Sequence, residues 1–223
     1  MIIHTINAVD LIKNITAKGV KVVAVSKTKP LEDIMSLYNS GHTVFGENRT
    51  KELKDKYDAL PKNIEWHFIG NLQSKQVKYI ISFVSMIHSA DSEKLLRIIN
   101  IESGKNNKVT DCLLQIYIAK EETKSGFEFD ELKKLLMSGI TKELLNINIR
   151  GVMAMATFTD DKTQIRNEFR NLKNYFDILK EEFFKEKDSF NEISMGMSND
   201  YEIAVEEGST MVRIGSLLFG KVS

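Results

Sequence analysis

The stretch VVAVSKTKP, residues 22–30, joins an apolar run to two lysines, Lys27 and Lys29. A continuous Val/Ala run is typical of a strand that is buried on both faces, as in parallel sheets covered by helices. Such strands carry their chemistry at their carboxyl ends, where a lysine amine can attack a carbonyl carbon and form a Schiff base. Lys27 is therefore a candidate nucleophile. The alternative is that both lysines merely reach water from the end of a buried strand.

A second group of candidate residues lies near the C-terminus, in the segments SMGMSND and VRIGS. Ser198 precedes a helical pattern, Gly215 lets a ligand approach the backbone, and Ser216 opens a final short turn. Hydroxyls and unpaired N–H groups at such places bind phosphate. Taken singly, Ser198 is as well explained as a helix N-cap and Gly215 as a turn glycine. Together with Lys27, they predict the two ends of a pyridoxal phosphate site.

Arg213 is a third candidate group for this site. If the last strand alternates, Met211, Arg213 and Gly215 share the face that points into a barrel. A charged side chain there needs a partner, and the ring nitrogen of the cofactor would supply one. A buried ion pair with Glu47 or Glu65 is the alternative.

The elements that must position these groups alternate along the chain. Short apolar runs bounded by polar residues or glycine predict eight strands, over residues 20–27, 43–48, 64–70, 84–90, 111–119, 148–157, 190–196 and 211–215. Helical periodicity falls between them, over residues 31–41, 49–60, 73–83, 92–104, 129–140, 163–183 and 200–208, with a leading helix at 5–18. This pattern predicts an α/β fold, a single (β/α)₈ TIM-type barrel domain over residues 1–223 with an extra N-terminal helix. A doubly wound open sheet is disfavoured, because no GxGxxG or P-loop follows any strand.

Composition limits the classes of function. Apolar residues make up 42% and charged residues 28%, with only 2 prolines, which is typical of a chain folded throughout. Lys plus Arg and Asp plus Glu both number 31, so there is no basic excess for nucleic-acid binding. The lone Cys112 lies in an apolar run and is expected to be a core residue. Without a secretory leader or a run of about 18 apolar residues, we expect a cytoplasmic protein that binds neither membrane nor metal.

Seven segments resemble one family along almost the whole chain. They are VAVSKTKP, FGEN, WHFIGNLQSK, HSADSEKL, KSGF, GVMAMATF and SMGMSNDYEIAVEEGSTMVRIGSLLFG, in this order. On these segments the sequence resembles the YggS/PROSC family of pyridoxal phosphate homeostasis proteins, whose fold is similar to the barrel domain of bacterial alanine racemase. The resemblance implies that the amine of Lys27 forms the Schiff base and that Lys29 is a neighbouring cation.

The resemblance also implies contacts around the cofactor. The groups expected at the phosphate are Ser198, Gly215 and Ser216, and Arg213 is expected at the ring nitrogen. Asn48 and Met155, near the ends of the second and sixth strands, are expected to border the cofactor. His67 is expected to be a core residue, and Lys124, in the loop after the fifth strand, to be solvated.

The expected function is binding of pyridoxal phosphate in its intracellular homeostasis, without efficient turnover. The expected partners are the cofactor and apoenzymes that require it, and the expected state is a monomer or weak dimer. A racemase or decarboxylase is the main alternative, but it needs a second acid/base group, which racemases of this type take from a separate β domain that we do not expect here. Arg213 also cannot accept the pyridinium proton, which weakens the electron sink. A class I aldolase would keep Lys27 but leave Arg213 unexplained.

Overall fold

The strands of this protein close into a barrel. The computed structural model describes residues 2–119 and 125–220. Its eight parallel strands follow chain order around the barrel, and β8 pairs back to β1. They are β1 (Lys21–Val25), β2 (Val44–Glu47), β3 (Glu65–Phe68), β4 (Met86–Ala90), β5 (Thr110–Gln115), β6 (Ile147–Met153), β7 (Glu192–Met197) and β8 (Met211–Ile214). The predicted barrel is confirmed, and the open-sheet alternative is wrong.

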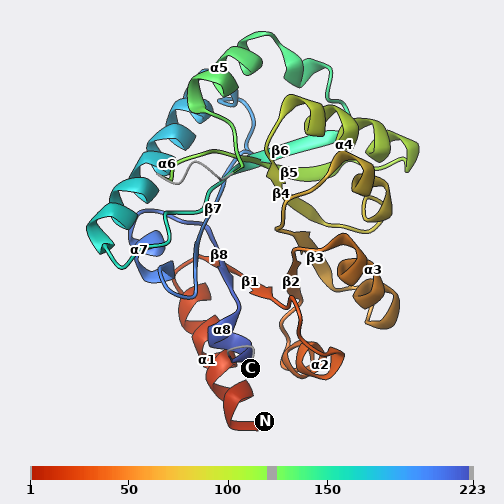
Figure 1. Cartoon of the computed structure of the whole chain (residues 1–223), viewed down its shortest axis with the longest axis vertical. Coiled ribbons are helices and arrows are strands. Elements are labelled where there is room, and N and C mark those ends of the chain that lie inside the picture. The colour runs from red at the N-terminus through yellow and green to blue at the C-terminus, as the bar shows by residue number, and fades with distance from the viewer. Residues whose placement is uncertain (1, 120–124, 221–223) are drawn as a thin grey trace.

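Helices surround the ring of strands (Figure 1). The α-helices are α1 (Ile2–Thr16), α2 (Leu31–Asn39), α3 (Thr50–Ala59), α4 (Glu93–Lys105), α5 (Phe129–Met137), α6 (Lys162–Phe183), α7 (Tyr201–Glu206) and α8 (Ser216–Phe219). Two 3-10 helices, η1 (Ser74–Tyr79) and η2 (Ile140–Lys142), complete the set. The expected extra helix is α1, which packs against α8. Among the described helices, none has the length and apolar composition needed to cross a membrane.

Some expected elements differ from those observed. Residues 73–83 were expected to form one helix, but only the 3-10 helix η1 forms there. The expected fifth strand, 111–119, leaves the sheet after Gln115, and Ile116 makes only an isolated bridge to Phe127. The pattern over 129–140 divides at Gly139, whose φ of +82° ends the helical path. Most apolar residues of these segments are buried or half-buried, although Tyr79 and Met137 are exposed, so the hydrophobic pattern predicted burial better than backbone conformation.

Two apolar clusters form the core. The smaller one lies inside the barrel and consists of Val23, Met86, Leu113, Met153 and Met211. The larger one lies between the strands and the helices, and it includes Cys112 as well as Val212 and Ile214 of β8. The predicted alternation along β8 is therefore confirmed, with Met211 inside the barrel and its neighbours outside. Cys112 is a buried core residue as predicted, and burial raises the pKa of its thiol.

Gly151 allows β6 and β7 to approach each other closely. Its φ is +153°, and a Cβ at this position would lie 1.8 Å from the carbonyl oxygen of Glu192. The pairing of β5 with β6 also shifts register near this point, between Cys112 and Leu113. Any side chain at Gly151 would push β7 away from β6. The glycine therefore sets the position of the strand that leads to Ser198.

Candidate functional site

Lys27 lies at the carboxyl end of the barrel, in the turn after β1. The inward residues of β1 continue from the buried Val23 through the half-buried Val25 toward Lys27. The side chain of Lys27 is exposed, and its amine makes no hydrogen bond or ion pair with any residue that the structure describes. A lysine amine without a partner at this end of the barrel is available as a nucleophile.

Lys29 is engaged elsewhere. Its Nζ donates hydrogen bonds to the carbonyl oxygens of Phe219, at 3.2 Å, and Gly220, at 3.0 Å, at the C-terminal end of α8. A lysine in this place satisfies helix carbonyls that have no partner within the helix. Lys29 therefore ties the loop after β1 to α8, and its amine is not free in the way that the amine of Lys27 is.

Ser198, Gly215 and Ser216 lie together where β7 and β8 end. The N–H of Gly215 donates to Ser198 Oγ at 3.2 Å, which joins the two loops. Gly215 is the N-cap residue of α8, and Ser216 begins that helix with an exposed side chain. Ser198 is not a helix N-cap, because α7 begins at Tyr201 and Asp200 holds the N-cap position. The hydroxyls and the N–H form a group of donors that can turn toward an anion.

The pairing of β1 with β8 brings these donors close to Lys27. Val23 lies opposite Arg213 in this pairing. Two residues further along each strand, a Cβ on Gly215 would lie 3.4 Å from the Cβ of Val25. Lys27 follows Val25 by two residues, so it extends beyond Gly215 at the mouth of the barrel.

Asn48 reaches the mouth from the other side of β1. Val25 pairs with Gly46, and Asn48 therefore follows β2 at the level where Lys27 follows β1. The backbone of Asn48 is packed closely, because a Cβ on Gly70 would lie 2.3 Å from its carbonyl oxygen. Gly70 thus permits the loop after β3 to touch Asn48, and its role at the mouth was missed in the sequence.

Arg213 is buried inside the barrel, as its position on β8 predicts. Nη1 donates to the carbonyl oxygen of Ser194, at 2.9 Å, and to Ser194 Oγ, at 2.7 Å, while Nη2 donates to the carbonyl oxygen of Ala154, at 3.0 Å. These bonds use three of the five N–H groups, and with no further acceptor among the described residues, the Nε–H and one Nη2–H are left for a ligand. Burial lowers the pKa of Arg213 to about 10, and the side chain stays cationic at neutral pH. Met155 follows Ala154 and packs on the interior cluster.

The alternative partners predicted for Arg213 are wrong. Glu47 is fully buried but bonds to Lys56 at 2.7 Å, and Glu65 is an exposed residue at the start of β3. The guanidinium group of Arg213 is satisfied by backbone carbonyls and one hydroxyl instead. These hydrogen-bond acceptors are neutral, so they do not cancel the positive charge of Arg213, and that charge can act on a ligand.

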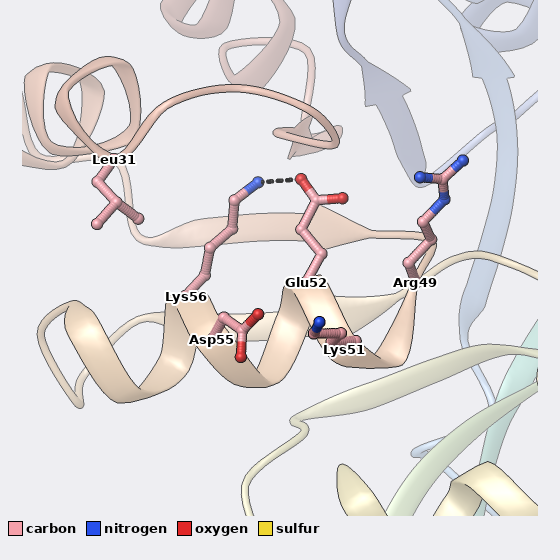
Figure 2. Close-up of a pocket in the computed structure, with 6 residues that line it drawn as sticks. All are labelled: Leu31, Arg49, Lys51, Glu52, Asp55 and Lys56. Atoms are coloured by element: carbon pink, nitrogen blue, oxygen red, sulfur yellow. Dashed lines mark hydrogen bonds and ion pairs between the residues drawn. The ribbon is translucent and has the colours of Figure 1, made fainter.

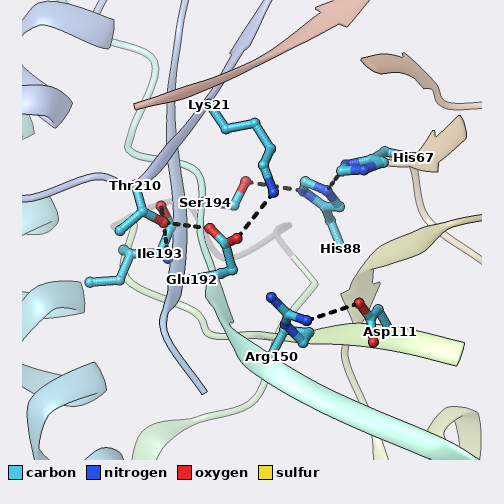
Figure 3. Close-up of polar contacts among 9 residues, drawn as sticks. All are labelled: Lys21, His67, His88, Asp111, Arg150, Glu192, Ile193, Ser194 and Thr210. Carbon is cyan, nitrogen blue, oxygen red and sulfur yellow. Dashed lines mark hydrogen bonds and ion pairs between the residues drawn. The ribbon is translucent and has the colours of Figure 1, made fainter. Parts of the chain in front are cut away.

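A chain of hydrogen bonds leads from Arg213 across the barrel interior. Figure 3 shows its part from Ser194 through His88 to His67. Ser194 Oγ lies 3.0 Å from His88 Nδ1, and His88 Nε2 lies 2.9 Å from His67 Nδ1. A guanidinium only donates, so Ser194 accepts from Arg213, and His88 Nδ1 is the one acceptor among the described residues for the proton of Ser194. His88 is then protonated at Nε2 and donates to His67, which carries its proton at Nε2 as well. Arg213 therefore determines the tautomers of both rings.

Both rings are neutral because they are buried. Burial, with a smaller contribution from the charge of Lys21, lowers the pKa of His67 to about 3. Burial, the neighbouring His67 and Arg213 lower the pKa of His88 in the same direction. His67 is thus a core residue as expected, although its partner is another side chain and not the backbone. His88 and Ser194 were missed, and the only signal for them was their place on the inward face of a predicted strand.

Charged residues near the amino ends of the strands are paired with one another (Figure 3). Lys21 Nζ lies 3.2 Å from Glu192 Oε1, and Thr210 Oγ1 donates to Glu192 Oε2 at 2.7 Å. Arg150 and Asp111 form a longer pair at 3.4 Å. These charges have partners, whereas Lys27, at the carboxyl end, has none among the described residues. The carboxyl end is therefore the candidate site.

The chemistry that this end can perform follows from its groups. A molecule with an aldehyde, a phosphate and a ring nitrogen would match the free amine of Lys27, the donors at Ser198 and Gly215, and the remaining N–H groups of Arg213. Within the described ranges, no cluster of three or more His, Cys, Asp or Glu side chains could hold a metal ion. Lys124 lies outside the described residues.

Comparisons with known proteins give the family of the chain. The family model for the alanine racemase N-terminal domain matches residues 6–222. The pyridoxal phosphate homeostasis protein of Aquifex aeolicus is 43% identical over 202 residues, which cover 90% of this chain and 86% of that protein. The protein of the same name from Haemophilus influenzae is 36% identical over 211 residues, covering 93% and 87%.

Solved structures show the same fold. The chain is similar to PipY of Synechococcus elongatus without pyridoxal phosphate, with a TM-score of 0.88 and 28% identity over 96% of this chain and 100% of that one. The form of PipY with pyridoxal phosphate bound has a TM-score of 0.85 at the same identity and coverage. An alanine racemase of Clostridium difficile has a TM-score of 0.75 at 16% identity, covering 98% of this chain and 57% of that one, and shares the fold alone.

Proposed function

Since the chain belongs to the family of pyridoxal phosphate homeostasis proteins, we propose that it binds pyridoxal phosphate at the mouth of the barrel and holds it as a Schiff base on Lys27. The observation that carries the proposal is the free amine of Lys27 beside the paired Ser198 and Gly215. In the step proposed, Nζ of neutral Lys27 attacks the aldehyde carbon, a C=N bond forms and one water molecule leaves.

The phosphate would bind where β7 and β8 end. Ser198 Oγ and the N–H of Gly215 now bond to each other at 3.2 Å, a length at the weak end for an N–H···O bond. A phosphate oxygen is a stronger acceptor than a hydroxyl, so both groups gain by turning to it. Ser216, exposed at the start of α8, adds a second hydroxyl. Asn48 and Met155 would border the cofactor from β2 and β6.

Arg213 supports a carrier function over a catalytic one. One of its two free N–H groups would face the ring nitrogen, and a guanidinium cannot take a proton from that nitrogen. Pyridoxal phosphate supplies an electron sink when its ring is protonated, and Arg213 disfavours that state. The contacts to Ser194 and Ala154 hold the cation in place. We therefore propose that the protein takes part in pyridoxal phosphate homeostasis without efficient turnover of amino acids.

Further parts of this proposal concern partners, location and assembly. The exposed Lys27 suits exchange of the cofactor with apoenzymes that require it. We propose a cytoplasmic monomer or weak dimer, in which residues 1–223 act as a single domain. The closed barrel supports the last point, because it draws on strands from residue 21 to residue 214.

The replacement Lys27→Ala tests the proposal. Purified parent protein should show a visible absorbance band with pyridoxal phosphate, and borohydride reduction should leave the cofactor's mass on the Lys27 peptide. Lys27→Ala should lose both signals and keep its circular dichroism, because Lys27 contacts no described residue of the fold through its amine. The control is Lys51→Ala, which removes another exposed lysine on α3. An unchanged band in Lys27→Ala would refute the assignment.

A further inference from the structure

The turn that carries Lys27 has an unusual backbone. The N–H of Lys29 donates to the carbonyl oxygen of Ser26 at 3.0 Å, which closes a turn with Lys27 and Thr28 at its centre. Thr28 has a φ of +62°. This left-handed conformation is disfavoured for a β-branched residue, so the surrounding structure must hold it. The direction in which the chain leaves Lys27 therefore depends on contacts outside the turn.

Two side chains of α3 make these contacts. Glu52 Oε1 accepts a hydrogen bond from the N–H of Thr28 at 2.6 Å. Lys56 Nζ donates to the carbonyl oxygen of Ser26 at 2.7 Å. The peptide groups on both sides of Lys27 are thus bonded to a neighbouring helix. Figure 2 shows Lys56 and Glu52 rising side by side from α3, with Nζ and Oε1 joined at 2.7 Å.

Lys56 is fully occupied by this arrangement. Its three acceptors are the carbonyl oxygen of Ser26, Glu52 Oε1 and Glu47 Oε1, each at 2.7 Å. A lysine ammonium has three protons to donate, so none is left over. Glu47 also accepts from Ser26 Oγ at 2.6 Å. Lys56 is therefore no candidate for the Schiff base, although it lies beneath the same turn.

The cluster is buried at its centre and open at one edge. The side chains of Lys56 and Glu47 are 6% and 0% exposed, while that of Glu52 is 21% exposed. Glu52 borders a hollow of about 390 Å³, lined by Leu31, Arg49, Lys51, Glu52, Asp55 and Lys56 (Figure 2). Burying two carboxylates and one ammonium is costly compared with apolar packing. What this cluster contributes beyond apolar packing is a fixed position for the two peptide groups it binds.

We infer that Lys56, together with Glu52, is a positioning group that holds the turn of Lys27 so that its amine points into the mouth of the barrel. The inference rests on the proposed function, in which Lys27 forms the Schiff base. It predicts that loss of Lys56 or Glu52 weakens cofactor binding without removing any group that touches the cofactor. Lys56 acts through the backbone of Ser26, and Glu52 acts through the backbone of Thr28.

The test compares the parent protein with Lys56→Met, Glu52→Gln and the control Lys54→Met. Lys54 lies on the same helix and also forms a pair four residues apart, with Asp58, but it does not contact the turn. Each protein is titrated with pyridoxal phosphate by absorbance, reduced with borohydride and digested. Mass spectrometry then gives the fraction of the label on Lys27, and thermal unfolding shows that each variant is folded.

We expect the apparent affinity of Lys56→Met to fall by about tenfold or more, the factor for one lost hydrogen bond to a charged group. The labelled fraction at Lys27 should fall with it. Glu52→Gln should lower both the affinity and the labelled fraction, but by less than Lys56→Met does. Lys54→Met should match the parent protein in both. Adding Thr28→Gly to Lys56→Met should restore part of the affinity, because glycine adopts a positive φ without help. If Lys56 only stabilised α3, Thr28→Gly would not restore the affinity for pyridoxal phosphate.

The outcomes separate this inference from the proposed function. A parent protein with no label on Lys27 refutes the proposed function itself. A parent labelled on Lys27, with Lys56→Met folded and equal to it in affinity and label, refutes the inference alone. If Lys56→Met does not fold, Glu52→Ala decides, because Glu52 is partly exposed and alanine leaves the N–H of Thr28 without this acceptor. Equality of Glu52→Ala with the parent then overturns the inference.

Discussion

Acid should weaken this fold through the histidine pair inside the barrel. Burial, and to a smaller extent the charge of Lys21, lowers the pKa of His67 from 6.5 to about 3. In the unfolded chain the ring returns to its ordinary pKa. Between these two values the unfolded state binds a proton that the folded state does not. The free energy of unfolding is therefore complete above about pH 6.5 and falls progressively as the pH drops toward 3.

The replacement His67→Asn isolates this contribution. An asparagine amide oxygen can take the place of Nδ1 and accept from His88, and it does not titrate. One pKa unit corresponds to about 1.36 kcal/mol, and pH 5 lies about 1.5 units below the ordinary pKa of histidine. Between pH 7.5 and pH 5, the parent should thus lose about 2 kcal/mol more of its unfolding free energy than His67→Asn. The carboxylates and His88 are present in both proteins, so their effects largely cancel.

Urea unfolding at pH 7.5, 6 and 5 measures this difference. The single tryptophan, Trp66, is fully buried in β3 and reports unfolding by its fluorescence. Nitrogen-15 spectra of the imidazole rings provide an independent check, since His67 should stay neutral with its proton on Nε2 down to pH 5. Parallel loss of stability in parent and variant would refute the reasoning. So would a His67 ring that takes up its proton near pH 6.5 in the folded state.

Two further predictions concern groups that would contact the cofactor. Ser198→Ala should weaken pyridoxal phosphate binding by about 1.5 to 3 kcal/mol, the loss for one hydrogen bond to a charged acceptor. An absorbance titration measures this change, and an unchanged dissociation constant would argue against Ser198 at the phosphate. Arg213→Met should shift the pH titration of the bound cofactor's absorbance upward, because the ring nitrogen can then keep a proton. It should also lower the unfolding free energy by about 1 to 3 kcal/mol, because the carbonyl group of Ala154 loses its donor, whereas that of Ser194 keeps the N–H of Ala154. Spectra identical to the parent's would show that Arg213 does not face the ring.

The sequence predicted features that depend on local pattern. The alternation of apolar and polar residues in β8 placed Arg213 inside the barrel, and the continuous apolar run of β1 placed Lys27 at a strand end. Both positions depend only on the period of a strand. The closed order of the strands followed from their regular alternation with helices. Such features need no knowledge of distant parts of the chain.

The partners of buried polar groups could not be predicted in this way. A pair with Glu47 or Glu65 was the alternative considered for Arg213, but Arg213 bonds to carbonyl groups at the ends of β6 and β7, and Glu47 bonds to Lys56. The strand period gives the face on which a side chain lies, but not its height or reach inside the barrel. Those depend on register shifts, such as the one between β7 and β8 near Ser194, which no local signal marks. His88 was missed for the same reason.

The contact between Lys29 and α8 joins parts of the chain that are 191 residues apart. Contacts this remote form late in folding, because a long loop must close before they can be made. Synthesis runs from the N-terminus, so the turn of Lys27 leaves the ribosome long before β8 and α8 exist to complete its surroundings. Until then Lys27 is an ordinary exposed lysine on an incomplete chain. At the proposed site, cofactor binding would thus be coupled to closure of the barrel, because only a molecule that has brought β8 back to β1 brings Lys27 together with Ser198 and Gly215.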